Sequence, residues 1–486
     1  MKSPLPMKSL RWFALPFAIA AVAAAASPDS IEGKWVGTAG PADNRAVFAL
    51  DLRRDSAGAL VGTFCLDQIN YYNQPLPAIH VADSKYSVPD FGLELALQGD
   101  RLVGTFGGSK NPVELARSDR LPEDSPVPDV PAGPDPLWQA QLGSAIYATA
   151  AVRDGTAYVG TLGGVFHAVK LVDGNLAWTF SAGRPILGEA LATADAVFFT
   201  CDNGRLYKLE RATGKELWHY DLGDAMVPRI LPHPAVYDYD HEAPTPVLAD
   251  GVIYLGSGDG GFHAVRADNG QRVWRIDAPG KIRGTAAVYG TNVVFGTLDG
   301  PIIMVERASG REVWRFDTKT PVTSSPVFLG ETLVVGNRGS ALYGMNPVDG
   351  SRRWAKSWWG SWIESTAAPA GEFACIGSSD YRRVTCFDPK DGRVVWATDV
   401  HGWSWARPLV TERTVYAATG GASPYPIRHV AGLCALDRVT GKIRWRRPVA
   451  QVPGAYAWGF AAGCAAEGRT VVVGGLDGTL YAFPVD

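Results

Sequence analysis

Two short stretches of the chain concentrate side chains that could hold a ligand by stacking. KSWWGSWIES, residues 356–365, contains Trp359 and Trp362, and HGWSWARP, residues 401–408, contains Trp405. An indole offers a large apolar face and one N–H donor, which suits it to sugars, flat rings and protein side chains. We therefore expect these stretches to form part of a ligand-binding surface. The alternative is that individual indoles pack beneath loops.

A third stretch, residues 224–246, has residue types that bind metals. It carries two histidines and three carboxylates in a Pro-rich segment, and imidazoles with carboxylates are ligands of zinc sites. Their spacing matches no metal motif, and a Pro-rich acidic connection is typical of a solvated lid. We predict a solvated lid and no metal site. The side chains concerned are His233, Asp238, Asp240, His241 and Glu242.

Composition and charge restrict the classes of partner. The 486 residues carry a formal net charge of -3. Residues 1–26 place three basic residues before an apolar run that ends in Ala24, Ala25 and Ala26, the pattern of a secretory signal cleaved before Ser27. Losing those three positive charges takes the net charge from -3 to -6, which argues against nucleic acid and anionic membranes as partners. We expect an exported monomer, periplasmic or secreted, without a membrane span.

A Gly-x-x-x-Trp unit recurs seven times along the chain. RASGREVWRFDT at residues 307–318 resembles RATGKELWHYDL at 211–222 and RVTGKIRWRRPV at 438–449. Successive Trp residues are 40, 56, 40, 40, 42 and 49 positions apart, and short apolar runs alternate with Gly, Asp and Asn turns. A period of roughly 40 with four strands per unit is typical of a propeller blade. The repeated indoles are those of Trp178, Trp218, Trp274, Trp314, Trp354, Trp396 and Trp445.

The last unit of the repeat is incomplete. Residues 459–486 supply three strands and end where the Gly and Trp should follow. DPLWQAQLG, residues 135–143, contains Trp138, which lies 40 positions before Trp178. This stretch can supply the missing outer strand, which removes exposed sheet edges. We predict an all-β fold with an eight-bladed propeller, in which the Gly permits the positive φ of a tight turn and the Trp packs between neighbouring blades.

The residues before the propeller follow a different pattern. Residues 27–118 alternate apolar and polar side chains between Gly-containing turns, which predicts a small antiparallel β-barrel, with a sandwich as the alternative. The G-x-W opening and the sequence LVGTF, found at 60–64 and again at 102–106, resemble a lipocalin-type barrel. Such a barrel could hold an apolar ligand or be filled by its own side chains. Residues 119–134 predict a stiff Pro/Asp-rich linker, and residues 135–486 the propeller, closed by strand 135–143.

The repeat A-x-D-x-x-T-G-x-x-x-W, best kept in ALDRVTGKIRW at residues 435–445, resembles the pyrroloquinoline-quinone-type propeller repeat. The resemblance implies either a quinoprotein dehydrogenase or a non-enzymatic propeller such as the scaffold of bacterial outer-membrane assembly. Quinoprotein alcohol dehydrogenases typically hold the quinone with Ca²⁺ and a disulfide between adjacent cysteines, and this chain has no Cys-Cys pair. We therefore predict a binding or scaffolding module of the bacterial envelope, with a protein or glycan partner and no cofactor. The alternative is a sugar or alcohol oxidoreductase that uses pyrroloquinoline quinone with Ca²⁺.

The residues that enter the innermost strand of each blade should surround one mouth of the central channel. We hypothesise that the aromatic members stack on a flat or sugar-like ligand while Arg283 and Glu364 orient it. The alternative is that the aromatic rings seal the joints between blades and the charges pair across a wet channel. No catalytic residue is identified, although an oxidoreductase would have Glu364 or Glu189 as its base. Aligned blades place Tyr147, Leu187, Ala243, Arg283, Thr323, Glu364, Trp405 and Trp458 at the mouth, with Glu189 and Arg407 one step inside, where Thr or Ser is usual.

The six cysteines are an even number, which is compatible with disulfides after export. Cys375 and Cys386 flank IGSSDYRRVT, a stretch that predicts a hairpin and would bring them onto adjacent strands. A Cys375–Cys386 disulfide is the best candidate, and buried free thiols are the alternative.

Overall fold

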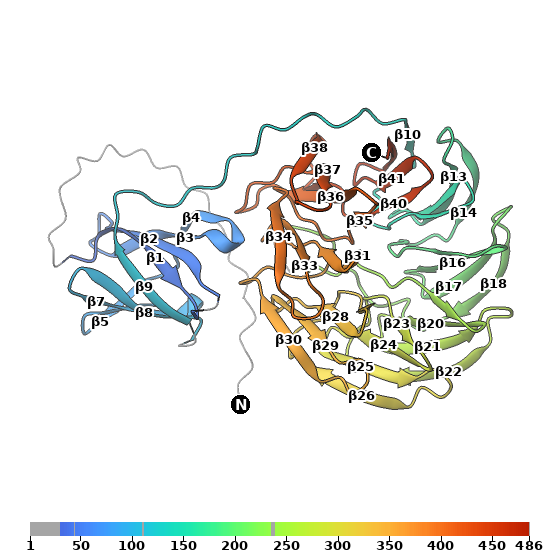
Figure 1. Cartoon of the computed structure of the whole chain (residues 1–486), viewed down its shortest axis with the longest axis horizontal. Helices are drawn as coiled ribbons and strands as arrows, with labels where there is room; N and C mark the ends of the chain where they lie inside the picture. The colour runs from blue at the N-terminus through green and yellow to red at the C-terminus, as the bar shows by residue number, and fades with distance from the viewer. Residues whose placement is uncertain (1–29, 43, 109–110, 235–238, 486) are drawn as a thin grey trace. The chain divides into compact units, whose positions relative to one another are not determined.

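The computed structural model describes residues 30–485 except 43, 109–110 and 235–238, so the predicted signal peptide lies outside the described residues. The chain forms two compact units (Figure 1). The first contains the residues up to Val127, and the second contains most of the residues from Pro128 onward. No helix in the described part is long and apolar enough to cross a membrane.

The first unit is a single curled antiparallel sheet of nine strands, in agreement with the predicted antiparallel barrel-like domain. It comprises β1 (Gly33–Ala39), β2 (Ala46–Arg54), β3 (Leu60–Leu66), β4 (Tyr71–Pro75), β5 (His80–Ala82), β6 (Lys85–Val88), β7 (Leu93–Gln98), β8 (Arg101–Phe106) and β9 (Asn111–Arg117), with 3-10 turns η1 (Asp67–Ile69) and η2 (Pro89–Phe91). The strands follow the order β4-β3-β2-β1-β9-β8-β7-β6-β5. Among the described residues, the edge strands β4 and β5 do not pair with each other.

Apolar side chains fill the interior of this sheet. Trp35, Leu102 and Leu115 are buried, while their neighbours along each strand are more exposed, as the two-residue period of a strand requires. The Trp35 Nε1–H donates to the Ile31 carbonyl oxygen at 2.7 Å. A cavity lined by Leu95 and other apolar side chains measures about 10 Å³, room for one water molecule at most.

The second unit is an eight-bladed propeller of four-stranded antiparallel sheets, which confirms the predicted fold (Figure 1). Blade 1 comprises β11 (Ala151–Arg153), β12 (Thr156–Gly160), β13 (Val165–Lys170) and β14 (Leu176–Ser181), and blade 2 comprises β15 (Leu191–Ala192), β16 (Ala196–Cys201), β17 (Arg205–Glu210) and β18 (Glu216–Asp221). Blade 3 comprises β19 (Val247–Ala249), β20 (Val252–Gly256), β21 (Gly261–Arg266) and β22 (Arg272–Asp277), and blade 4 comprises β23 (Ala287–Tyr289), β24 (Asn292–Gly296), β25 (Pro301–Glu306) and β26 (Glu312–Asp317).

The remaining four blades continue the pattern. Blade 5 comprises β27 (Val327–Leu329), β28 (Thr332–Gly336), β29 (Ala341–Met345) and β30 (Arg352–Ser357), and blade 6 comprises β31 (Ala368–Ala370), β32 (Phe373–Ile376), β33 (Arg383–Phe387) and β34 (Val394–Asp399). Blade 7 comprises β35 (Leu409–Val410), β36 (Thr414–Ala422), β37 (Gly432–Asp437) and β38 (Ile443–Pro448), with β39 (Ala457–Gly459) paired to β36. Blade 8 comprises β40 (Cys464–Glu467), β41 (Thr470–Gly474), β42 (Thr479–Pro484) and β10 (Trp138–Gln141).

Blade 8 joins the beginning of the propeller to its end. β10 is its outermost strand and pairs antiparallel with β42, with Trp138 opposite Ala482. Figure 1 shows these strands side by side although they come from opposite ends of the unit. The ring of sheets is therefore closed by main-chain hydrogen bonds.

Neighbouring blades share apolar cores. The middle strands of each blade are buried on both faces, which explains their nearly continuous apolar sequences. Phe262 of β21 stacks on Phe295 of β24, with ring centroids 4.0 Å apart. Burying such side chains contributes about 1.5–3 kcal/mol each relative to exposure.

Each blade Trp packs on a glycine of the next blade. A Cβ atom on Gly214 would lie 2.4 Å from the Trp178 ring, and the Trp178 Nε1–H donates to the Arg211 carbonyl oxygen at 3.0 Å. Gly214 has a φ of 73°, so both its backbone and its neighbour require glycine. The same contact joins Trp138 to Gly174, Trp218 to Gly270, Trp274 to Gly310, Trp314 to Gly350, Trp354 to Gly392, Trp396 to Gly441 and Trp445 to Gly133.

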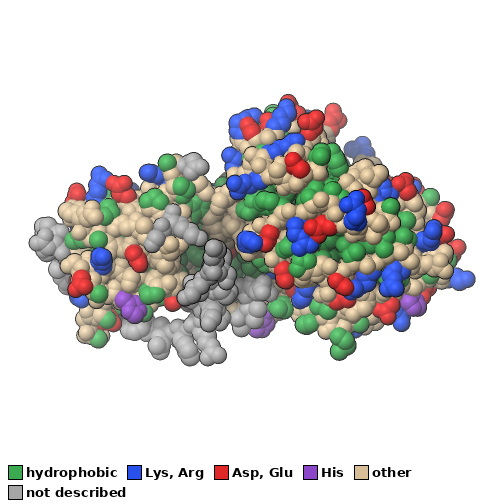
Figure 2. All heavy atoms as spheres, turned by 90° about the horizontal axis from the view of Figure 1, so that it is seen from below, with side chains coloured by type: hydrophobic (Ala, Val, Ile, Leu, Met, Phe, Trp, Pro, Cys, Tyr) green, Lys and Arg blue, Asp and Glu red, His purple; other side chains and the backbone are tan. Residues whose placement is uncertain are grey.

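Charges of both signs are distributed over the surface of the propeller. Figure 2 shows Lys and Arg side chains interspersed with Asp and Glu on the face in view. This face therefore has no extended patch of a single sign, in line with the nearly balanced composition.

Candidate functional site

The insertion before blade 3 enters the mouth of the propeller. We call its residues Tyr239–Glu242 the mouth segment. They contact side chains that lead into the innermost strands of several blades. This segment and its contacts form the candidate site.

The Asp240 carboxylate is held by three cationic side chains. It accepts hydrogen bonds from Arg283 Nε at 2.6 Å and Nη2 at 2.8 Å, from Lys281 Nζ at 2.8 Å and from Arg229 Nη1 at 3.3 Å. Burial alone would raise the pKa of Asp240, but the hydrogen bonds and charges of Arg283, followed by Arg229 and Lys281, hold it well below its usual range. The carboxylate is therefore charged throughout the neutral pH range.

Arg229 ties the insertion to blade 2. Its Nε lies 3.0 Å from both carboxylate oxygens of Asp202, in the turn after β16, and its Nη2 donates to Asp202 Oδ1 at 2.7 Å. The Asp240 N–H donates to the Ile230 carbonyl oxygen at 2.7 Å. The two described parts of the insertion are thus joined to each other and to a blade through a charge network.

His241 lies among aromatic rings. Its ring centroid is 4.8 Å from that of Trp405 and 5.7 Å from that of Tyr147. Trp405 in turn stacks on Trp403, with centroids 4.5 Å apart and an interplanar angle of 17°. Burial, followed by the charge of Arg338, lowers the pKa of His241 to about 3, so its imidazole is neutral at neutral pH.

Tyr239 extends this aromatic cluster. Its ring meets those of Trp362 and Trp405 edge-on, each at a centroid distance of 6.2 Å. Its hydroxyl lies 3.3 Å from the hydroxyl of Tyr456. Edge-to-face contacts of this kind add to the stabilisation from buried area.

The charge of a second carboxylate, that of Glu364, acts on Glu242. Arg338 donates to Glu364 Oε1 from Nε at 2.9 Å and from Nη2 at 2.6 Å, and its guanidinium lies 4.4 Å from the Trp362 ring centroid. Glu364 Oε2 is buried and has no hydrogen-bond partner among the described residues. Glu242 keeps some accessible surface, but burial raises the pKa of its carboxyl well above the usual value; the charge of Glu364 adds to the rise, and the charge of Arg338 acts in the opposite direction. The site favours protonated Glu242.

The structure brings together part of the mouth that the sequence suggested. Tyr147, Arg283, Trp362, Glu364 and Trp405 all lie around the mouth segment. Of the other two indoles, Trp458 is in β39, opposite Gly421 of β36, and Trp359 is in the connection after β30 with a φ of 48°.

The expected solvated lid is wrong for the mouth segment. Asp240 and His241 expose only 5% and 4% of their surface. The reason is electrostatic, because Arg283 is buried at the mouth and a buried cation needs a paired anion. No group of three or more His, Cys, Asp and Glu side chains in the described part could hold a metal ion, and Asp238 lies outside that part.

One step inside the mouth, hydroxyl side chains connect successive blades. The Thr245 N–H donates to Thr285 Oγ1 at 2.9 Å, the Thr285 N–H to Ser325 Oγ at 2.9 Å, and the Ser325 N–H to Thr366 Oγ1 at 3.2 Å. Each bond joins the segments that lead into the innermost strands of two successive blades. This series explains why Thr or Ser is usual at the position.

Glu189 and Arg407 replace the hydroxyl in blades 2 and 7. Both side chains are exposed, and neither forms an ion pair within the described residues. Protein surrounds the Glu189 carboxyl closely in spite of its accessible surface, and this desolvation raises its pKa to about 7, while the charge of Arg407 acts in the opposite direction. Glu189 can therefore gain or lose a proton near neutral pH.

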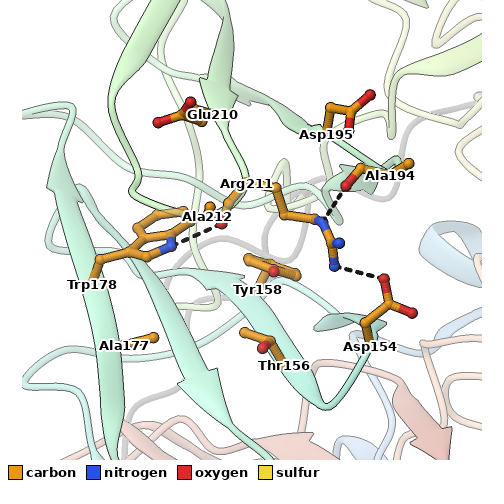
Figure 3. A pocket seen from close by; sticks show the side chains of 10 residues that line it. All are labelled: Asp154, Thr156, Tyr158, Ala177, Trp178, Ala194, Asp195, Glu210, Arg211 and Ala212. Atoms are coloured by element: carbon orange, nitrogen blue, oxygen red, sulfur yellow. Dashed lines mark hydrogen bonds and ion pairs between the residues drawn. The ribbon is translucent and has the colours of Figure 1, made fainter.

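A groove of about 380 Å³ lies between blades 1 and 2 (Figure 3). Arg211 crosses it and pairs with Asp154 at 2.9 Å. The same pair recurs between blades 3 and 4, where Arg307 and Asp250 are 2.6 Å apart. Because the arrangement repeats, we attribute the groove to the blade architecture and assign it no ligand.

Cys375 and Cys386 lie directly opposite each other on β32 and β33. Both are free thiols in the structure. Hydrogen bonding to Cys386, together with burial, raises the pKa of Cys375. The disulfide between them stays a prediction.

The sequence interpretation missed the basic residues that hold the mouth segment. Arg229, Lys281 and Arg338 lie in connections, where the repeat assigns no structural role. The signal that could have found them is charge balance, because basic residues near a predicted mouth require anions and the adjacent insertion supplies Asp240.

Comparison with protein families gives a match to a model described as outer membrane protein assembly factor BamB, at residues 131–238, 202–361 and 357–485. Among curated proteins, outer membrane protein assembly factor BamB of Yersinia pestis is 27% identical over 143 residues, which are 28% of this chain and 35% of that protein. The chain thus spans about a third of the length of this relative.

Two solved structures are similar to this chain in fold. The computationally designed Ika8 protein has a TM-score of 0.57 at 15% identity and covers 72% of this chain and 100% of its own. Quinohemoprotein alcohol dehydrogenase from Comamonas testosteroni has a TM-score of 0.55 at 15% identity and covers 72% of this chain and 76% of its own. At these identities the likeness concerns the fold alone.

Proposed function

The chain belongs to the family described as outer membrane protein assembly factor BamB, and on this premise we propose that it is a non-enzymatic, protein-binding propeller of the bacterial cell envelope. Its role would be that of a scaffold, in which the propeller presents a binding surface to another protein. Of the two partner classes that the sequence suggested, we favour protein over glycan.

The observation that supports a protein partner is the mouth segment itself. The mouth accommodates four consecutive residues of polypeptide through ion pairs to Asp240 and ring contacts to Tyr239 and His241. Paired charges around buried aromatic side chains are typical of protein–protein interfaces. A mouth that accommodates a peptide of its own chain is suited to a peptide of another.

Export is part of this proposal. The basic and apolar pattern of residues 1–26 supports cleavage before Ser27 and release into the periplasm or the medium. Mass spectrometry of the protein from the envelope fraction should give a mature chain that begins at Ser27. An intact Met1 on the cytoplasmic protein would contradict export.

Photo-crosslinking from two exposed positions tests the binding role. Met226, in the insertion, and Val172, in the turn between β13 and β14, are 92% and 85% exposed. A photoreactive residue at 226 should crosslink to a protein of the envelope in living cells, whereas one at 172 should give much weaker crosslinks. Equal crosslinking at the two positions, or none at either, would contradict a specific protein partner at the mouth.

The alternative function is a sugar or alcohol oxidoreductase that uses pyrroloquinoline quinone with Ca²⁺. The described residues at the mouth do not fit a flat quinone, because His241 covers Trp405 and Asp240 neutralises Arg283. The quinone would have to displace the mouth segment. Titration with pyrroloquinoline quinone, with and without Ca²⁺, followed by Trp fluorescence and by dye reduction with sugars and alcohols, tests the alternative. Saturable quenching with Ca²⁺-dependent turnover would overturn the scaffold proposal.

A further inference from the structure

The mouth offers more cationic groups than the blades themselves neutralise. Lys281 and Arg283 approach from the connection before β23, and both bind Asp240 of the mouth segment. Arg283 exposes 3% of its surface. Without the segment, this buried guanidinium would lose its carboxylate partner, a state that proteins avoid at considerable cost in free energy. The position of Asp240 is therefore specific for a carboxylate.

The positions on either side of Asp240 bind aromatic, neutral side chains. Tyr239 lies against Trp362 and Trp405, and His241 lies against Trp405 and Tyr147. His241 exposes 4% of its surface, and its Nδ1 has no hydrogen-bond partner among the described residues. These sites accept flat side chains without requiring that particular imidazole.

The last position of the mouth segment fits poorly. The charge of Glu364 acts unfavourably on an ionised Glu242, and Glu364 itself exposes 3% of its surface and has an Oε2 without a partner in the described part of the chain. A buried carboxylate oxygen without a donor is unfavourable, and a second acidic group beside it is more so. An amide at this position would remove the repulsion by Glu364, and an ammonium group would replace it by attraction. The segment thus fits the mouth at its first three positions, residues 239–241, and fits poorly at the fourth, Glu242.

We propose that the mouth is a peptide-binding site occupied by Tyr239–Glu242 as an internal ligand of imperfect fit, and that the external ligand is a partner segment with the pattern aromatic, Asp, aromatic, then Lys, Arg or Gln. This inference rests on the proposed protein-binding function and specifies its ligand. The partner segment binds by displacing the internal one. Its apparent association constant is therefore the intrinsic constant multiplied by the fraction of mouths that the internal segment leaves open. The fourth residue, where the internal segment has Glu242, distinguishes the partner segment from the chain's own.

Synthetic peptides test the proposal on the full mature chain. The first probe is a capped peptide with the chain's own residues 238–243, DYDHEA. In the second its glutamate is lysine, and in the third its central aspartate is asparagine, as in Asp240→Asn. The protein is a released variant with Tyr239→Gly, Asp240→Ser, His241→Gly and Glu242→Ser, compared with wild type and with a Met226→Ala control in the same insertion. Binding is measured by calorimetry at pH 7 in about 50 and 150 mM salt.

The DYDHEA peptide should bind the released variant at least tenfold more tightly than it binds wild type or the control. The lysine peptide should bind at least tenfold more tightly than DYDHEA, and the asparagine peptide at least tenfold more weakly. Equal binding of all three peptides would overturn the proposal, because charge at the Asp240 and Glu242 positions would then not matter. No binding of DYDHEA to a folded released variant would also overturn it.

Two single substitutions keep the test decisive if the released variant does not fold. Glu242→Gln improves the internal ligand, so the lysine peptide should bind this variant at least threefold more weakly than wild type. Asp240→Asn weakens the internal ligand, so the same peptide should bind at least threefold more tightly. Effects in the opposite directions would overturn the proposal. If crosslinking from position 226 identifies a partner but no peptide binds the mouth, this inference fails while the protein-binding function stands.

Discussion

At the scale of single residues, the mouth segment combines two titrating groups with opposite pH dependence. The pKa of Glu242 is raised in the folded protein, so stability from this group is complete below its unfolded value, near 4.5, and is lost as pH rises. The pKa of His241 is lowered to about 3, so the folded state loses stability as pH falls from about 6.5 toward 3. The mouth should therefore be most firmly closed in mildly acidic solution, between the unfolded pKa values of the two groups, about 4.5 and 6.5.

Glu242→Gln should stabilise the protein at neutral and alkaline pH. Glutamine fills nearly the same volume, carries no proton to lose and is not repelled by the charge of Glu364. We expect the melting temperature at pH 7 to rise by about 1–3 °C, with little change at pH 4. Calorimetry at pH 4, 5.5, 7 and 8 measures this, with Glu331→Gln at an exposed turn as the control. A decrease at pH 8 would contradict the prediction.

The sequence indicates the residues of the mouth better than it indicates their partners. Tyr147, Arg283, Glu364 and Trp405 can be found because the repeat fixes which residue enters each innermost strand. The position of Asp240 cannot be found in this way, because an insertion has no period and its conformation depends on long-range charge pairing. Local sequence patterns carry no information about pairing of that kind.

At the scale of elements, the contact between the Trp of one blade and a glycine of the next holds neighbouring blades together. Gly214 and Gly155 have the same φ of 73°, but a Cβ on Gly214 would lie 2.4 Å from Trp178, whereas a Cβ on Gly155 would meet nothing within 4 Å. The two glycines therefore separate the cost of backbone strain from the cost of a steric clash.

Gly214→Ala should be more destabilising than Gly155→Ala. Both alanines adopt a left-handed backbone, at a cost of about 1 kcal/mol, and only alanine at 214 also displaces an indole, at a further cost of about 1–3 kcal/mol. Chemical denaturation of both variants measures the difference. Equal losses of stability would show that the Trp178 contact contributes nothing beyond the turn.

The strands and their joints could be predicted because each blade repeats the same local pattern. Alternating turns, β-branched runs and the Gly-x-x-x-Trp unit all indicate the same four-stranded sheet. The exception is Gly133, which receives Trp445 although it is five residues rather than four before Trp138. A fixed spacing therefore misses the glycine that the chain supplies from upstream.

At the scale of the whole molecule, the propeller depends on β10 for closure. Without this strand, β42 would present an unpaired edge, and the Trp138 contact with Gly174 would be lost. Two N-terminal truncations separate this effect from removal of the first unit. One begins at Pro128 and keeps β10, and the other begins at Ser144 and lacks it.

The truncated chain that begins at Ser144 should melt at least about 10 °C below the one that begins at Pro128, or should lose cooperative unfolding. The reason is that an open ring loses the hydrogen bonds of β10 and the packing between blades 8 and 1. Thermal unfolding followed by circular dichroism measures the difference. Similar transitions for the two chains would show that closure by β10 is dispensable.

The closing strand also has a consequence for the order of synthesis. β10 is made before any of the blades, and its partner β42 is made only after the strands of blades 1 to 7. A ribosome or an export channel therefore delivers blades 1 to 7 while the first strand still has no partner. During this interval the strand could pair with another chain and exchange between two molecules. Cells that make this protein have reason to keep the emerging chain covered by a chaperone until its final residues appear.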